Sequence, residues 1–187
     1  ATDIAQATTA SAATLDLNNY GASAQGQVWN TYAPLFLTAA DTDGGMGCAT
    51  AIPKFDASGK LGITYGKTCT ANGNGDVIIR YSANKSIEGP RALAGMDPQA
   101  NDTCFGGTTT PSTSGDTTRL MADWDGVSAT VSTKCVPVHI GASDVATESF
   151  DQNTLSSTST ANYKNGNYDT KAFGENLSNV DDSLKPG

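Results

Sequence analysis

The sequence has a single histidine, few basic residues and no long apolar run. His139 stands alone among 187 residues, and 11 Lys and Arg face 19 Asp and Glu, which leaves a net charge of −8. Nucleic acids and anionic membrane surfaces attract basic patches, so neither is expected as a partner. No apolar stretch approaches the roughly 18 residues that a membrane-spanning helix needs, so no membrane insertion is expected.

Motifs for metal, cofactor or catalytic chemistry are also missing. The cysteines form no Cys-x-x-Cys pair, and one histidine cannot build a zinc or haem site. Ser143 beside Asp144 lacks a third member for a catalytic triad, and His139 is predicted as a packed or edge residue. The acidic pairs, such as Asp41 and Asp43, are interpreted as turn and surface residues. We therefore predict no enzyme, no metal and no cofactor.

Cysteine is present four times, at Cys48, Cys69, Cys104 and Cys135. In a chain rich in Gly, Ser, Thr, Asn and Ala, this number favours two disulfides, and three pairings are possible. The sequential pairing, Cys48–Cys69 and Cys104–Cys135, is favoured over the others and over free buried thiols. Each bridge would contribute about 3 kcal/mol through loop entropy.

The composition and the cysteines together favour a periplasmic or extracellular location. The first residues, Ala1-Thr-Asp, are typical of what remains after a signal peptide is removed, and removal of such a peptide is expected here. Residues 1–13 have no apolar period and are expected to be a flexible leader. Residues 151–187 have isolated apolar residues and are expected to be an extended or poorly ordered tail.

The middle of the chain, residues 14–150, predicts an α/β lobe. Alternating or continuous apolar residues predict strands at 14–18, 76–81 and 136–140, and helical spacing predicts helices at 25–40 and 87–96. Pro34 is expected to kink the first helix or to end its first half. Residues 46–75 and 97–119 are expected to be cysteine-bearing insertions, with a short strand at 63–65. Short strands are expected around Trp124.

Each predicted strand is followed by a turn of small or polar residues and then by a predicted helix start. These turns are residues 21–25, 82–86 and 141–144. If the three strands are parallel neighbours, all three turns share one sheet edge, where helix N-termini point free N–H groups at a common place. This arrangement predicts an oxyanion site without basic side chains. The alternative is that small residues only permit tight strand-to-helix turns.

Three segments resemble the phosphate-type periplasmic solute-binding proteins, in the order found in that family. "VHIGASDVATESF" is similar to the family's "DFGASDAP", "VIIRYSANKSIEGPRAL" to its "NYxGxGSSGG" turn, and "LNNYGASAQGQVW" to its "GAGATFPAP" start. The resemblance covers about residues 14–150. It implies one lobe of a type II binding protein with a mostly parallel sheet and short helices. Phosphate or another small oxyanion would be its ligand.

The resemblance also implies which residues bind the ligand. Gln25 matches the family's first-turn hydroxyl ligand, Ser86 its second-turn serine and Asp144 its aspartate, which accepts a proton from the bound oxyanion. Backbone N–H groups and hydroxyls near Ala24 and Ser143 donate the remaining hydrogen bonds.

The sequence departs from the family at several positions. Gln25 replaces Thr or Ser, and Lys85, Ile87 and Glu88 replace small residues, so that Glu88 would repel a dianion. The Ser-Gly-Thr turn of the family's second lobe is missing, so a second lobe or polypeptide is expected to complete the fold. The alternative function is a structural or adhesive extracellular subunit, filament-like or on a surface, that self-assembles without binding a ligand.

Overall fold

The computed structural model describes residues 12–86, 88–93, 95, 98, 102–104 and 116–144. The expected leader, tail and helix after Asp144 therefore lie almost wholly outside the described residues, as does most of the expected insertion at 97–119. The strands are β1 (Leu15–Ala22), β2 (Cys48–Phe55), β3 (Leu61–Cys69), β4 (Gly75–Asn84), β5 (Thr118–Asp123), β6 (Ser132–Pro137) and β7 (Ile140–Ala142). The α-helices are α1 (Gly26–Thr38) and α2 (Glu88–Leu93), and short 3-10 turns cover Ser23–Gln25, Asp41–Asp43 and Thr70–Asn72.

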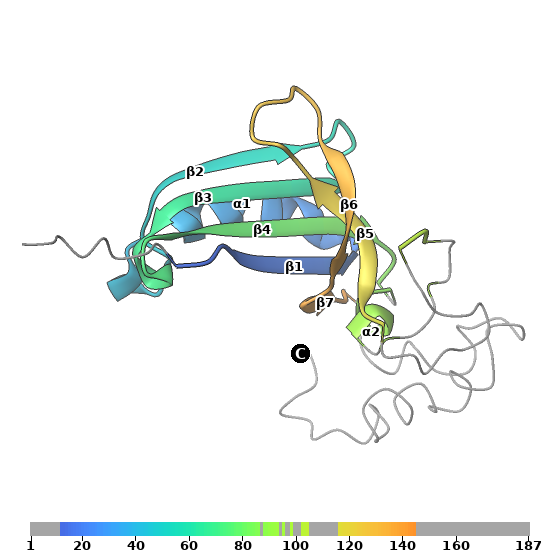
Figure 1. The fold of residues 1–187 in the computed structure, drawn as a ribbon. Coiled ribbons are helices and arrows are strands. Elements are labelled where there is room, and N and C mark those ends of the chain that lie inside the picture. Colours follow the sequence, from blue (N-terminus) through green and yellow to red (C-terminus); the bar gives the residue numbers. More distant parts are fainter. Residues whose placement is uncertain are drawn as a thin grey trace, which may run out of the picture.

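The chain folds as an α/β protein around a five-stranded sheet with the order β2-β3-β4-β1-β7. β1 lies between β4 and β7 and is parallel to both. β3 is antiparallel to both β2 and β4, so the sheet is mixed and not mostly parallel as predicted. A separate antiparallel ribbon of β5 and β6 crosses in front of the sheet, and α1 lies behind it (Figure 1).

The segment 46–75 is part of this sheet. It was expected as an insertion with one short strand, but it supplies β2 and β3, which extend the sheet beyond β4. The glycines that suggested a loop have packing reasons instead. A Cβ at Gly66 would lie 2.6 Å from the Cys48 sulfur, and one at Gly62 would lie 2.0 Å from Oδ1 of Asn30. Glycine therefore lets α1 and the disulfide sit close to β3.

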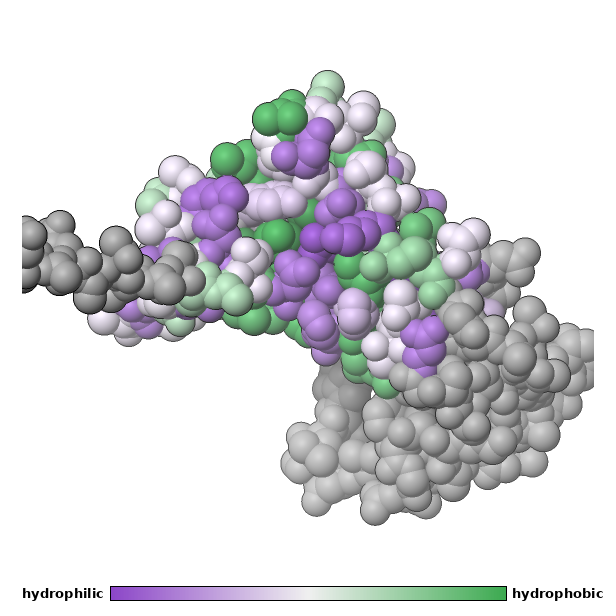
Figure 2. Space-filling view, viewed as in Figure 1, coloured by the Kyte–Doolittle hydropathy of each residue, from purple (hydrophilic) through white to green (hydrophobic). Residues whose placement is uncertain are grey.

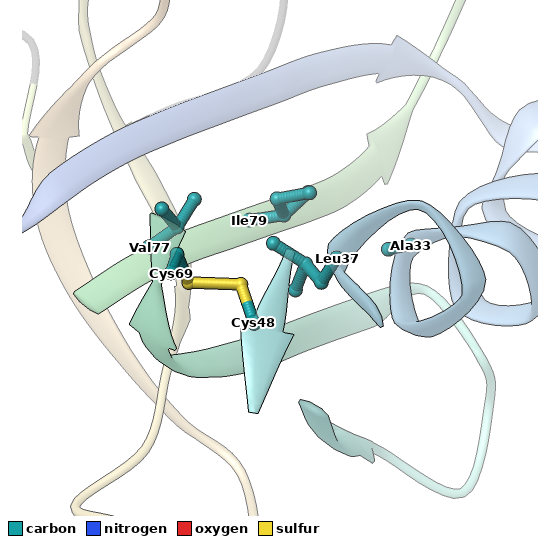
Figure 3. Packing of buried hydrophobic residues seen from close by; sticks show 6 residues of the cluster. All are labelled: Ala33, Leu37, Cys48, Cys69, Val77 and Ile79. Atoms are coloured by element: carbon teal, nitrogen blue, oxygen red, sulfur yellow. A yellow bond between two sulfur atoms is a disulfide. The ribbon is translucent and has the colours of Figure 1, made fainter. Parts of the chain in front are cut away.

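Both disulfides are those of the sequential pairing. Cys48 and Cys69 face each other across β2 and β3, and their sulfurs pack with Ala33 and Leu37 of α1 (Figure 3). Val77 and Ile79 of β4 complete this cluster. The second bridge joins Cys104 to Cys135 of β6. The described cysteines are therefore all oxidised, and none is a free thiol.

The front face of the sheet carries a second core beneath the ribbon. Ile63 and Ile78 of the sheet pack against Ala122 and Trp124, and the Tyr65 hydroxyl donates to the Trp124 carbonyl at 2.7 Å. Alternate residues of β4 thus face the two layers, because successive side chains of a strand point to opposite sides. Figure 2 shows mainly hydrophilic residues over the middle of this front view.

Arg80 is the polar centre of the same face. Its side chain is 3% exposed, and its guanidinium lies 3.1 Å from Asp16 of β1 and 3.2 Å from Asp123 at the end of β5. It also donates to Oδ1 of Asn18 at 3.2 Å. A buried arginine is tolerated because these acceptors replace the water it loses. The Arg80–Asp123 pair fastens the ribbon to the sheet, whereas the contacts with Asp16 and Asn18 join β4 to β1.

The strand predicted at 136–140 and the helix predicted at 25–40 differ in the structure from the sequence-based expectations. The strand predicted at 136–140 is divided, because β6 ends at Pro137 and β7 begins at Ile140 in the other sheet. Gly141, expected to break that strand, pairs with Tyr20 inside β7. Pro34 was expected to kink the helix or to end its first half. It lies inside α1, which continues to Thr38, so the helix does not end there.

Candidate functional site

The carboxyl ends of β1, β4 and β7 meet at one edge of the sheet, as the three turns predicted. Gly21 and Ala22 at the end of β1 pair with Ala83 and Asn84 at the end of β4. Gly21 also pairs with Ala142 at the end of β7. We call this edge, with residues 21–25, 84–86 and 142–144, the strand tips. Ala24 and Asp144 are exposed there, and Gln25, Ser86 and Ser143 are half-buried.

The predicted ligand residues at the strand tips bond to one another. Gln25 Nε2 donates to the Ser143 carbonyl at 3.0 Å. The Ser86 hydroxyl donates to Oδ1 of Asp144, and the Ser23 hydroxyl donates to the Asn84 carbonyl. Side chains from all three tips therefore hold the tips together. A ligand that uses Ser86 or Asp144 has to replace their mutual hydrogen bond.

The N-terminus of α1 opens at the strand tips. Its N-cap residue is Gln25, no side chain caps its first turn, and that turn has no acidic residue. The first N–H groups of an α-helix have no intrahelical partner and form the positive end of the helix dipole. In this chain the Gly26 N–H donates to the Ser23 carbonyl of the preceding 3-10 turn, so the next N–H groups of the first turn are the candidates for binding an anion. Among the described residues of the strand tips, this is the feature that favours a bound anion most directly.

α2 does not present a similar N-terminus to the strand tips. Its first residue is Glu88, whose side chain is 1% exposed and lies 3.9 Å from Arg91 Nε. The Glu88 carboxylate was expected to repel a ligand. In the structure it is buried beside Arg91, whose positive charge offsets its own. The predicted helix at 87–96 is shorter, and the third predicted helix lies outside the described residues.

Glycines bring α2 onto the strand tips. A Cβ at Gly89 would lie 2.4 Å from the Ala142 carbonyl oxygen and 2.6 Å from that of Tyr20. Gly21 has a φ of +136°, and its Cβ would lie 2.1 Å from the same Ala142 oxygen. Such approaches exclude any side chain. Gly21 in the first turn and Gly89 in α2 therefore have a packing role.

Two buried tyrosines lie behind the strand tips. Burial raises the pKa of Tyr20 to about 12, although a hydrogen bond from Asn84 Nδ2 to its hydroxyl at 2.7 Å opposes the shift. Burial, with the nearby negative charge of Asp144, also raises the pKa of Tyr81 to about 12. The Tyr81 hydroxyl donates to the Ala22 carbonyl. Sequence reasoning missed both, because only the fold brings them to this edge.

His139 has a structural partner. Its Nδ1 accepts a hydrogen bond from the Asn18 amide at 3.3 Å, and its own amide donates to the Asn18 carbonyl at 2.9 Å. These bonds tie the crossing from β6 to β7 to β1. Across the described ranges, no three His, Cys, Asp or Glu side chains gather as a metal site would require. Within the same ranges, no helix has the length and apolar character to cross a membrane.

Comparisons with protein-family models, with curated proteins and with solved structures find no match to this chain.

Proposed function

We propose that this chain is a lobe of a periplasmic or extracellular solute-binding protein that binds a small oxyanion, phosphate by resemblance, at the strand tips. The observation that carries the proposal is the order β4-β1-β7, in which the chain's second and third parallel strands flank the first. The path from β1 to β4 includes α1 on the back face. The path from β4 to β7 includes the β5–β6 ribbon on the front face.

Connections on opposite faces make a topological switch point between β1 and β7. In open α/β sheets, ligands bind outside the carboxyl ends of the strands at such a point. The resemblance of the three turns to the phosphate-type binding proteins implies a ligand site at the same edge of the sheet. The two disulfides are compatible with a location outside the cytoplasm.

The proposed site uses neutral donors and one acceptor. The proposed donors to the anion are the N–H groups that follow Gly26 in the first turn of α1, the amide of Gln25 and the hydroxyl of Ser86. The Gly26 N–H itself donates to the Ser23 carbonyl. An ionised aspartate accepts hydrogen bonds and cannot donate them, so Asp144 would favour an anion that still has a proton, such as hydrogen phosphate, over sulfate. A second lobe or polypeptide would close the exposed side of the strand tips.

Titration with phosphate tests this proposal. We expect amide NMR signals of Gly21, Gly26 and Asp144 to shift with added phosphate and less with sulfate. Asp144→Ala should weaken phosphate binding at least tenfold. The matched control is Asp43→Ala, which removes an exposed carboxylate beyond the opposite end of α1. Absence of any phosphate-dependent shift, or equal binding by Asp144→Ala, would overturn the proposal.

A structural or self-assembling extracellular subunit is the second candidate. The observation that favours it is a row of exposed apolar side chains on α1, which a monomer in water does not need. Light scattering over a concentration series tests it, because an assembling subunit grows in mass with concentration. A constant monomer mass would exclude it.

A further inference from the structure

One face of α1 is apolar and exposed. Val28, Tyr32, Leu35 and Phe36 are 52%, 60%, 59% and 40% exposed, respectively. Their spacing of four, three and one places them on one side of the helix. The opposite side of α1, with Ala33 and Leu37, packs in the core behind the sheet. We call the exposed set the α1 stripe.

The lack of charged residues on α1 favours a second copy of this chain as the partner of the α1 stripe. α1 contains no charged residue, from Gly26 to Thr38, in a chain with a net charge of −8. Two copies of an acidic chain repel each other wherever their carboxylates approach, so a contact between copies is favoured on a charge-free surface. An anionic membrane is a poor occupant because this helix offers no lysine or arginine to it.

We propose that the α1 stripe binds the α1 stripe of a second copy of this chain, with the two helices antiparallel around a two-fold axis near Tyr32. Tyr32 is the middle residue of α1, so it would meet its own copy across the axis. Val28 lies four residues before it and Phe36 four residues after it, so each would meet the other in the partner. The stripe is thereby self-complementary, as a two-fold interface requires.

The ends of the helix favour the antiparallel direction. Asp41 and Asp43 follow α1 in an exposed 3-10 turn at its C-terminal end. In an antiparallel pair, these carboxylates would lie toward the N-terminus of the partner's α1, which has no acidic residue in its first turn. A carboxylate near a helix N-terminus is stabilising. A parallel pair would instead bring both acidic turns together.

This inference goes beyond the oxyanion proposal and does not depend on it. The dimer would bring Asp41 and Asp43 toward the α1 N-terminus where the anion is proposed to bind, so dimerisation and anion binding are expected to oppose each other. It also differs from a filament, because a two-fold contact uses the same surface on both copies and closes at two. The full chain should therefore reach a mass of twice 19.1 kDa and no higher.

Sedimentation equilibrium of the full chain tests the inference. We expect a monomer–dimer equilibrium in the native protein and a monomer for Leu35→Glu, which places a carboxylate in the stripe. The matched control is Val127→Glu, since Val127 is an 85% exposed apolar residue in the loop between β5 and β6. That variant should dimerise as the native chain does. Circular dichroism should show native folding for both, because both positions are exposed.

Cross-linking tests the direction of the helices. Tyr32→Cys should form a disulfide-linked dimer on mild oxidation, because the two new thiols meet at the axis. Gln27→Cys, also exposed on α1 but outside the stripe, should not. A native chain that stays monomeric at the highest soluble concentration would overturn the inference. So would growth beyond a dimer, or dimers that persist in Leu35→Glu.

Discussion

Tyr20 and Tyr81 show how burial changes single residues at the strand tips. Each has less than 4% of its surface exposed, and each phenol has a hydrogen-bond partner from a neighbouring strand tip. A phenolate in either place would be poorly hydrated, so burial favours the protonated form. Both hydroxyls therefore act as fixed hydrogen-bonding groups across the ordinary pH range.

The raised pKa values of these tyrosines predict alkaline unfolding. Each pKa is about 12 in the folded chain and about 10 in an unfolded chain. The unfolded state therefore loses these protons first as pH rises. The stabilising contribution is complete below pH 10 and is lost as pH rises through about 12. Urea unfolding followed at pH 8, 10 and 11 should show decreasing midpoints.

Tyr20→Phe and Tyr81→Phe separate this effect from general alkaline repulsion. Each variant has no phenol to ionise at its position, so its midpoint should fall less between pH 8 and pH 11 than that of the native chain. Tyr32→Phe serves as the control, because Tyr32 is 60% exposed. An equal decline in all of the chains would contradict the prediction.

At the scale of elements, α2 is held against β1 and β7 by a close backbone contact. Gly89 sits where any Cβ would collide with two backbone carbonyls and an amide. Neither a strand nor a packed helix can move easily to make room, because both are tied into the sheet. The position of α2 at the strand tips therefore requires glycine at position 89.

Gly89→Ala should destabilise the protein by about 3 kcal/mol, although alanine is the better helix former. The reason is overpacking against Ala142 and Tyr20. Gly126→Ala is the matched control, since a Cβ there meets nothing within 4 Å and only its φ of +86° is strained. That control should cost about 1 kcal/mol. Equal losses of unfolding free energy in urea would show that packing at α2 has no special role.

Much of the α/β pattern could be predicted from the sequence, but its arrangement could not. The apolar run at Val77–Ile79 indicated a strand, and the spacing of Val28, Tyr32 and Leu35 indicated a helix. These helix residues proved to be exposed, because Ala33 and Leu37 form the buried face of α1. β2 was missed because its exposed and buried residues lack strict alternation. β6 and β7 were merged because Val136, Val138 and Ile140 keep a two-residue period through the change of sheet.

The candidate site was predicted in its position and not in its internal bonds. The small-residue turns indicated that three strand ends would share one edge, and parallel pairing brings them there. Nothing local indicated that Gln25 would bond Ser143, because these residues are 118 positions apart. Contacts over such distances are set by the fold as a whole.

At the scale of the whole molecule, the disulfides differ in their access to solvent. Cys48 is 6% exposed and Cys69 is fully buried, whereas Cys135 lies exposed on β6. A thiolate reductant has to reach a sulfur atom before it can attack. The Cys104–Cys135 disulfide should therefore be reduced faster than Cys48–Cys69.

Mild reduction of the native protein should open Cys104–Cys135 before Cys48–Cys69. Alkylation followed by peptide mass spectrometry identifies which cysteines were released at each time. In urea above the unfolding midpoint, where burial no longer protects either bridge, the difference in rate should shrink. Simultaneous opening in the native state, or earlier release of Cys48, would contradict this expectation.

The position of β1 between two parallel neighbours has a consequence for how the chain is made. β1 emerges from the ribosome before the other described strands, yet one of its neighbours begins at Gly75 and the other at Ile140. Until residue 142 has been synthesised, at least one side of this strand has no partner in the sheet. A nascent chain therefore carries an open parallel edge from the synthesis of β1 to that of β7, and β7 is the last described strand.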